Sequence, residues 1–247
     1  MKKLGETRPF IAEVIIFLIG MVIALAVASL FSTLAYSNEV NIALGRIIAG
    51  LILFIVFRRS VTGGKPFSGM KFFPIAFLFA VWNIVYNLKG GAAFGKSGVL
   101  LPFILALAPA IFEEVIFRGI FIPNLKAKGY DNVTALIMSS AFFGGVHATN
   151  LVGADLKTTA LQIFYATVIG MVLGAIYLCT RDILSLILIH FSIDFASKLF
   201  SDGPTKSSVP ELVIFIALML LECAYVVWIM KKIDRDHFTE KIEQFDE

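Results

Sequence analysis

The sequence predicts an all-α membrane protein that crosses the bilayer several times, and three observations support this fold class. Of its 247 residues, 58% are hydrophobic and only 16% are charged, whereas a soluble domain has about 45–50% apolar and about 25% charged residues. The mean hydropathy is +0.88. The apolar residues are gathered in blocks of about 17–24 residues, the length at which a helix crosses a hydrocarbon core of about 30 Å. A large soluble helical protein is disfavoured, because eight such blocks leave too few polar residues to cover its surface.

The apolar blocks follow one another along the chain and are separated by short segments of turn-forming residues, such as 63–66 and 201–204. The sequence therefore predicts about eight spanning helices, at 11–31, 41–57, 73–88, 99–122, 133–149, 159–179, 182–200 and 210–230. No internal repeat or low-complexity tract divides the sequence. Residues 1–247 are therefore expected to form a single membrane domain with short tails.

Lysine and arginine are unevenly distributed over the predicted loops. If the N-terminus lies in the cytoplasm, fourteen of the 21 basic residues fall on the cytoplasmic side and five on the other, while Arg46 and Arg118 lie within spans. Because cytoplasmic loops are enriched in lysine and arginine, this distribution supports eight spans with both termini cytoplasmic. The first apolar stretch, of about 21 residues, exceeds the 7–15 of a secretory signal, so we expect an uncleaved first helix.

Charge and cysteine content argue against two other classes of protein. A net charge of +3 and a pI near 8.8 do not suggest a nucleic-acid partner. Cys179 and Cys223 both lie inside apolar blocks, so a disulfide scaffold is not expected.

A few ionisable residues lie inside the predicted spans. A charge near the bilayer centre costs roughly 2.5–3.5 kcal/mol on insertion scales, so such residues usually face a cavity and have a function. Those near helix ends, whose side chains can reach the interface, are Glu13, Asp182 and Lys198. The deeper residues are Arg46, Glu113, Glu114, Arg118, His147, His190, Asp194 and Glu222.

The fourth predicted span contains two adjacent glutamates and an arginine. Glu114 and Arg118 are four residues apart, so they share a helix face and can pair, while Glu113 is turned away by about 100°. The unpaired carboxylate could then act as a general base. Pro109 leaves the Leu105 carbonyl without its helical donor, so a kink or a water-lined gap is expected there. The alternative is a Glu–Arg pair that only joins two helices.

The fifth and seventh predicted spans each carry a histidine motif. In the fifth span, Phe143 lies one turn before His147 and could pack against it, and the glycines at 144 and 145 allow close helix approach or a local break. In the seventh, His190 and Asp194 share a face, so the carboxylate can orient the imidazole. The alternatives are a hydrogen-bonded core histidine and an isolated polar pair that stabilises packing.

Arg46 and Glu222 have no motif around them. A pair between the second and the eighth span is conceivable. For both residues we expect a structural role.

The three motifs together resemble a known family. The patterns E-E-x-x-x-R, F-x-x-x-H and H-x-x-x-D, in this order on separate membrane helices, look like the CAAX protease and bacteriocin-processing (CPBP or Abi) family, which includes the Ras-converting CAAX endopeptidases and many bacterial relatives. The resemblance covers roughly residues 99–200. It implies a multi-pass protein of the membrane, expected to be the bacterial plasma membrane, with membrane lipid around it and a peptide or protein substrate reaching a buried site.

The family resemblance implies catalytic roles for Glu113, Glu114, His147, His190 and Asp194, with Arg118 and Phe143 as supporting residues. Members are commonly described as metallo-endopeptidases. In that reading His147 and His190, with a carboxylate, would bind a divalent metal, expected to be zinc, with one open position.

A metal-free scheme has been argued for the eukaryotic CAAX enzymes. There the first glutamate and the first histidine activate water, and the second histidine and an asparagine hold the oxyanion. This sequence has Asp194 in place of that asparagine, and an ionised aspartate cannot donate a hydrogen bond. The sequence therefore favours metal assistance but leaves both mechanisms open.

Three functions are compatible with this pattern. The leading one is hydrolysis of a peptide bond within the membrane, with a prenylated or other membrane-associated substrate. The second is a non-catalytic membrane regulator or bacteriocin self-immunity protein of the same fold. A proton-coupled carrier is disfavoured because no inverted repeat is visible. One geometric difficulty concerns the first function: ideal straight spans would leave Glu113 and His147 some 9 Å apart in depth at about 1.5 Å per residue.

Overall fold

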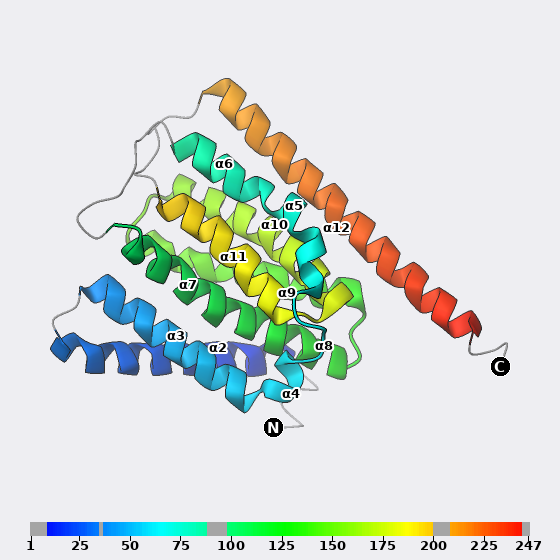
Figure 1. The fold of residues 1–247 in the computed structure, drawn as a ribbon, viewed down its shortest axis with the longest axis horizontal. Coiled ribbons are helices and arrows are strands. Elements are labelled where there is room, and N and C mark those ends of the chain that lie inside the picture. The colour runs from blue at the N-terminus through cyan, green and yellow to red at the C-terminus, as the bar shows by residue number, and fades with distance from the viewer. Residues whose placement is uncertain (1–8, 35–36, 88–97, 200–207, 244–247) are drawn as a thin grey trace.

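The computed structural model describes residues 9–34, 37–87, 98–199 and 208–243, and every regular element in them is a helix (Figure 1). The longer helices are α2 (Pro9–Phe31), α3 (Asn38–Val56), α6 (Leu78–Asn87), α7 (Leu100–Glu114), α9 (Asn132–Val146), α10 (Leu156–Thr180), α11 (Ile183–Lys198) and α12 (Val209–Glu243). The shorter ones are η1 (Ser32–Leu34), α4 (Arg58–Val61), η2 (Ser68–Phe72), α5 (Phe73–Ala76), η4 (Val115–Phe121), α8 (Ile122–Ala127) and η5 (His147–Val152). The predicted all-α class is confirmed.

Seven segments of the described chain are long and apolar enough to cross a membrane. They are Ile11–Phe31, Asn38–Val56, Ser68–Tyr86, Leu100–Ala127, Asn132–Val152, Leu156–Thr180 and Val209–Ile233. Each corresponds to one predicted span. The remaining predicted span is α11, which has 16 residues and is therefore about 24 Å long at 1.5 Å per residue. The count of eight crossings therefore stays a prediction.

Four predicted spans differ from the observed helices. The third is interrupted at Phe77, between α5 and α6, and is preceded by the 3-10 helix η2. The fourth continues beyond residue 122 to Ala127 through the π-helix η4. The fifth ends its α-helical part at Val146, and α12 extends past residue 230 to Glu243. Hydropathy does not register these features because it measures lipid compatibility rather than backbone geometry.

Aspartates begin three of the helices. Asp131 accepts a hydrogen bond from the Thr134 amide at 2.8 Å, and Asp155 accepts one from the Thr158 amide at 3.0 Å. These bonds stabilise the ionised side chains, so the hydrogen bonds from Thr134 lower the pKa of Asp131 below its usual value. Asp182, which was expected to reach the interface, is instead buried and accepts from Gly69 N at 3.0 Å. It thereby fixes η2 against the start of α11.

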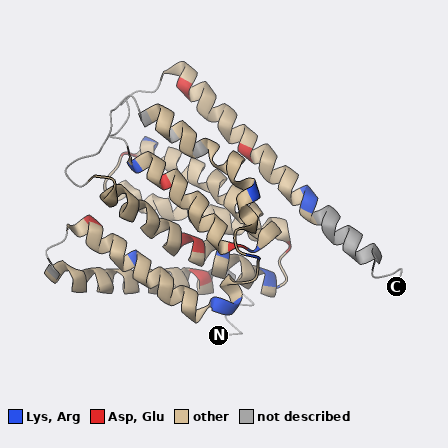
Figure 2. Cartoon of the chain, in the orientation of Figure 1, with Lys and Arg blue, Asp and Glu red and all other residues tan. Residues whose placement is uncertain are grey.

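The helices form a bundle around α7, α10 and α11 (Figure 1). The pair α2 and α3 lies on one side of this centre, and α6 and α12 lie on the other. Most of the ribbon carries neither acidic nor basic residues (Figure 2). Large apolar side chains such as Val22, Leu30 and Leu220 are exposed on α2 and α12, as expected for surfaces that face lipid. The start of α2 and the end of α12 lie on the same side of the bundle.

Candidate functional site

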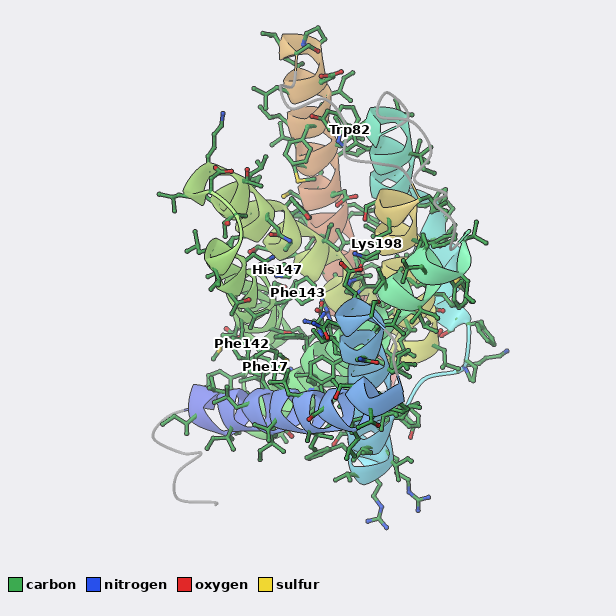
Figure 3. All side chains as sticks on the ribbon, turned by 90° about the vertical axis from the view of Figure 1, so that its left-hand side faces the viewer. Phe17, Trp82, Phe142, Phe143, His147 and Lys198 are labelled. Atoms are coloured by element: carbon green, nitrogen blue, oxygen red, sulfur yellow. The ribbon has the colours of Figure 1, made fainter. Side chains whose placement is uncertain are left out.

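The three motif helices surround one cavity of about 480 Å³. Both histidine motifs and Glu113 face it, and it is also bordered by α2, α3 and α10. Figure 3 views the bundle from the end where α11 stops. In this view the labelled Lys198 lies to the right of the labelled Phe143 and His147. The polar residues that line the cavity are Arg46, Glu113, His147, Thr149, Asn150, Gln162, Tyr165, His190, Asp194, Ser197 and Lys198.

Glu114 and Arg118 form a buried ion pair behind the cavity. Arg118 Nη1 donates to Glu114 Oε1 at 2.7 Å, and both side chains have 0% exposure. Arg118 Nη2 also donates to the Gly170 carbonyl on α10 at 3.3 Å. The predicted pairing is therefore confirmed, and it also ties α7 to α10.

The backbone that carries Arg118 is a π-helix, from Val115 to Phe121. A π-helix leaves a different hydrogen-bond pattern from an α-helix and often occurs at functional sites. Here the Phe117 carbonyl accepts a hydrogen bond from Ser139 Oγ of α9 at 2.9 Å. This irregular segment was not predicted, and no residue pattern in it gives a specific signal.

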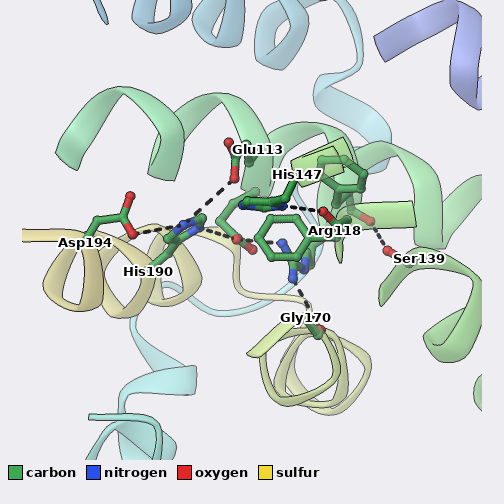
Figure 4. A network of polar contacts seen from close by, with 10 residues as sticks. Glu113, Arg118, Ser139, His147, Gly170, His190 and Asp194 are labelled. Atoms are coloured by element: carbon green, nitrogen blue, oxygen red, sulfur yellow. Dashed lines mark hydrogen bonds and ion pairs between the residues drawn. The ribbon is translucent and has the colours of Figure 1, made fainter. Parts of the chain in front are cut away.

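His190 is held among three carboxylates (Figure 4). Its Nδ1 lies 2.7 Å from Glu114 Oε1, so Nδ1–H donates to this carboxylate. Its Nε2 lies 3.8 Å from Asp194 Oδ1 and 4.0 Å from Glu113 Oε2, facing the cavity. The ring therefore presents Nε2 to anything bound beside Glu113.

His147 is the first residue after α9, and its Nδ1 lies 2.9 Å from the Phe143 carbonyl. Since a carbonyl only accepts, Nδ1–H donates and the neutral ring keeps a free lone pair on Nε2. The Phe143 ring packs against the rings of His147 and His190, with centroids 5.4 Å and 5.9 Å apart, and against the Arg118 guanidinium at 4.3 Å. Phe143 thus orients both histidines, as its spacing predicted for His147.

Glu113 is the carboxylate that remains outside the ion pair. Its side chain is 17% exposed, compared with 0% for Glu114. It lines the same cavity as His147, so the two residues face a common space despite the difference in depth expected for ideal straight helices. Leu105 and Pro109 border the same cavity, in agreement with the predicted gap beside the proline.

Arg46 is the main residue whose position was not expected. It was assigned a structural role, but it lines the cavity from α3. The expected partner Glu222 lies elsewhere, on α12, beside Ile169 and Ile193. Neither Glu222 carboxylate oxygen has a hydrogen-bond partner among the described residues. The conceivable Arg46–Glu222 pair is therefore wrong, since the two residues belong to different cavities.

The cavity contains the residue types that the predicted zinc site would need, namely two histidines and two carboxylates. A catalytic zinc has three protein ligands at about 2.0–2.3 Å. Within the described parts of the chain, no group of three or more His, Cys, Asp or Glu side chains is arranged to hold a metal ion. His190 presents Nδ1 to Glu114 and has Nε2 about as far from Glu113 as from Asp194. Among the described residues, the donor arrangement therefore does not fit the expected zinc site.

A family model described as type II CAAX prenyl endopeptidase Rce1-like matches residues 95–196. This segment contains all three motifs and agrees with the predicted range of 99–200. The family resemblance inferred from the motifs is thereby confirmed. No curated protein and no solved structure matches the chain.

Proposed function

We propose that the chain, whose residues 95–196 match the model of the type II CAAX prenyl endopeptidase Rce1-like family, hydrolyses a peptide bond of a membrane-associated substrate with water activated by Glu113. The observation that carries this proposal is the different environment of the two adjacent glutamates. Glu114 is neutralised by Arg118, whereas Glu113 is directed into the cavity beside two histidines. A carboxylate without an arginine partner is available to accept a proton.

The reaction begins with a water molecule between the Glu113 carboxylate and His147 Nε2. Glu113 accepts one proton from this water, while the water oxygen forms a bond to the peptide carbonyl carbon. The carbonyl oxygen becomes an oxyanion, which His190 can stabilise by donating from Nε2 as an imidazolium. The C–N bond then breaks, and Glu113 returns the proton to the leaving amine, so that the products are a carboxylic acid and an amine.

Three carboxylates support this role of His190. Glu114 holds Nδ1–H at 2.7 Å, and Asp194 and Glu113 lie within 4.0 Å of Nε2. Negative charges at this distance favour a positively charged imidazole. Asp194 then acts by stabilising the imidazolium, which needs no hydrogen-bond donor at this position.

The test is cleavage of prenylated and unprenylated reporter peptides by the purified protein in detergent. Glu113→Gln and His147→Ala are expected to lose activity by about 10²–10⁴-fold, the usual contribution of general acid–base catalysis. Glu222→Gln is the matched control, because Glu222 is also a buried glutamate but borders a separate void. Full activity in both site variants would exclude the proposed reaction. A folded wild-type protein that cleaves none of the peptides would instead favour the non-catalytic regulator.

Metal dependence requires its own measurement. Metal content of the purified protein and activity after treatment with a chelator separate the two mechanisms. The route through Glu113 and His147 predicts activity that survives chelation. Loss of activity with recovery on adding zinc would restore the metal-assisted mechanism.

A further inference from the structure

Two amide side chains bridge the two elements that form one wall of the cavity. Asn150 belongs to the 3-10 helix η5 and Gln162 to the first half of α10, and both border the cavity. Asn150 Nδ2 donates to Gln162 Oε1 at 2.7 Å. Tyr165, one turn later on α10, forms a side-chain hydrogen bond with Gln162. The amide pair is therefore fixed in position, although the reaction proposed above uses neither of its residues.

The bond to Gln162 determines which way the Asn150 amide points. In a planar amide the nitrogen and the carbonyl oxygen lie on different arms, so the bond made by Nδ2 directs Oδ1 away from Gln162. A carbonyl oxygen can accept two hydrogen bonds, and none of the described residues donates to this one. Because Asn150 borders the cavity, its oxygen is available as an acceptor to a ligand that binds there.

His147 and Asn150 lie on the same face of η5. This segment runs from His147 to Val152 as a 3-10 helix, in which residues three apart eclipse one another at a rise of about 2.0 Å per residue. The two residues are therefore about 6 Å apart along the helix axis. An extended peptide rises about 3.3 Å per residue, and its alternate residues direct their backbone groups to the same side. A peptide lying along this face would thus meet His147 and Asn150 with backbone groups two residues apart.

We propose that the Asn150 carbonyl oxygen accepts a hydrogen bond from a backbone N–H of the substrate two residues from the cleaved bond, with Gln162 as the residue that orients it. This inference rests on the proposed endopeptidase function. An amide is uncharged and does not select an ionic group, whereas backbone N–H groups are present in every peptide, whatever its side chains. Main-chain hydrogen bonds of this kind contribute affinity and hold an extended peptide in register.

The test replaces single backbone amides of a reporter peptide by esters, which removes one N–H without adding bulk. Two esters are compared with the parent peptide, one two residues before the cleaved bond and one two residues after it. The wild-type protein is expected to cleave one of them with a kcat/KM about three- to tenfold lower than the parent, the effect of losing one hydrogen bond. Parent-like cleavage of both esters would overturn the inference.

Substitutions in the amide pair then assign the preference to these residues. Asn150→Ala should remove the preference by slowing the parent peptide alone, because this variant has no acceptor to lose. Gln162→Ala should weaken the preference, while Gln162→Glu should keep it, since a carboxylate still accepts from Asn150 Nδ2. Asn132→Ala is the matched control, because Asn132 lies at the other end of α9 and does not border the cavity. If Asn150→Ala slows all three peptides by the same factor, the amide pair only joins η5 to α10 and the inference is wrong.

A binding measurement separates this inference from the proposed reaction. Protein with Glu113→Gln cannot activate water, so its affinity for the parent peptide and for esters at each backbone position reports recognition only. Weaker binding of one ester, with loss of this difference after adding Asn150→Ala, would support the inference even if no cleavage is found. Equal binding of all the peptides, or differences that all persist in the double variant, would overturn it.

Discussion

Two neighbouring glutamates of α7 have opposite surroundings because successive residues on a helix point about 100° apart. Glu114 is fully buried and bound by Arg118 and His190, whereas Glu113 faces the cavity. The pair differs in position by one residue and is chemically identical. Substituting each in turn therefore separates stability from catalysis.

Glu114→Gln is expected to lower the free energy of unfolding, while Glu113→Gln leaves it nearly unchanged. Removing the charge of Glu114 leaves the guanidinium of Arg118 buried without a counter-ion, which costs about 3–5 kcal/mol. Thermal unfolding of both variants in the same detergent measures this difference. Equal stability of the two variants would show that the ion pair is not what stabilises this region.

Asp194→Asn is expected to keep only part of the cleavage activity: a neutral amide at this position can still interact with His190 or donate to an oxyanion, but it no longer supplies the negative charge that stabilises the imidazolium. Asp194→Leu removes both possibilities and should lower kcat/KM by about 10–100-fold, the range for losing a polar contact to a charged group. Rates for both variants on the same reporter peptide test this. Inactivity of the asparagine variant would show that the negative charge itself is required.

At the scale of elements, α9 and α10 approach closely through Gly144. A Cβ atom at this position would lie 2.0 Å from Thr167 Oγ1 and 2.8 Å from the Ile163 carbonyl oxygen. The threonine can move but the backbone carbonyl cannot. The neighbouring Gly145 has nothing within 4 Å of its Cβ position. Of the two uses expected for the paired glycines, close approach therefore applies to Gly144.

Gly144→Ala is expected to destabilise the protein by about 1–3 kcal/mol, as overpacking does, and to reduce cleavage because His147 follows directly after this helix. Gly145→Ala is the matched control and should be neutral or slightly stabilising, since alanine favours a helix over glycine by about 1 kcal/mol. Unfolding temperature and cleavage rate are measured on both. The same loss in both variants would contradict the role of close packing.

What the sequence predicts at this scale depends on whether the interaction is local. The Glu114–Arg118 pair and the packing of Phe143 on His147 follow from four-residue spacing, and both were expected. The π-helix around Arg118 and the approach of Arg46 depend on contacts between helices that are distant in sequence. The bond between Ser139 and Phe117 is one such contact. A residue pattern within one helix therefore does not predict the π-helix, the position of Arg46 or the Ser139–Phe117 bond.

At the scale of the whole molecule, α11 is the part of the site whose crossing of the membrane is still a prediction. This helix carries His190 and Asp194 but is only about 24 Å long at 1.5 Å per residue, compared with a hydrocarbon core of about 30 Å. Hydrophobic mismatch of this size is tolerated by local thinning of the bilayer or by flanking polar residues. Asp182 and Lys198 lie at its two ends. Because α11 packs in the centre of the bundle (Figure 1), its neighbours can shield it from lipid.

Eight crossings predict that Lys157 and Lys198 lie on one side of the membrane, and Arg59 and Lys231 on the other. If α11 turned back without crossing, Lys198 would lie opposite Lys157. Single cysteines at these four exposed positions, in a protein whose two native cysteines are replaced by alanine, can be labelled in intact cells with an impermeant maleimide. Labelling of the first two positions only, with the other two labelled after permeabilisation, is the expected result. Different accessibility of the cysteines at 157 and 198 would exclude a crossing α11 and, with it, the predicted count of eight crossings.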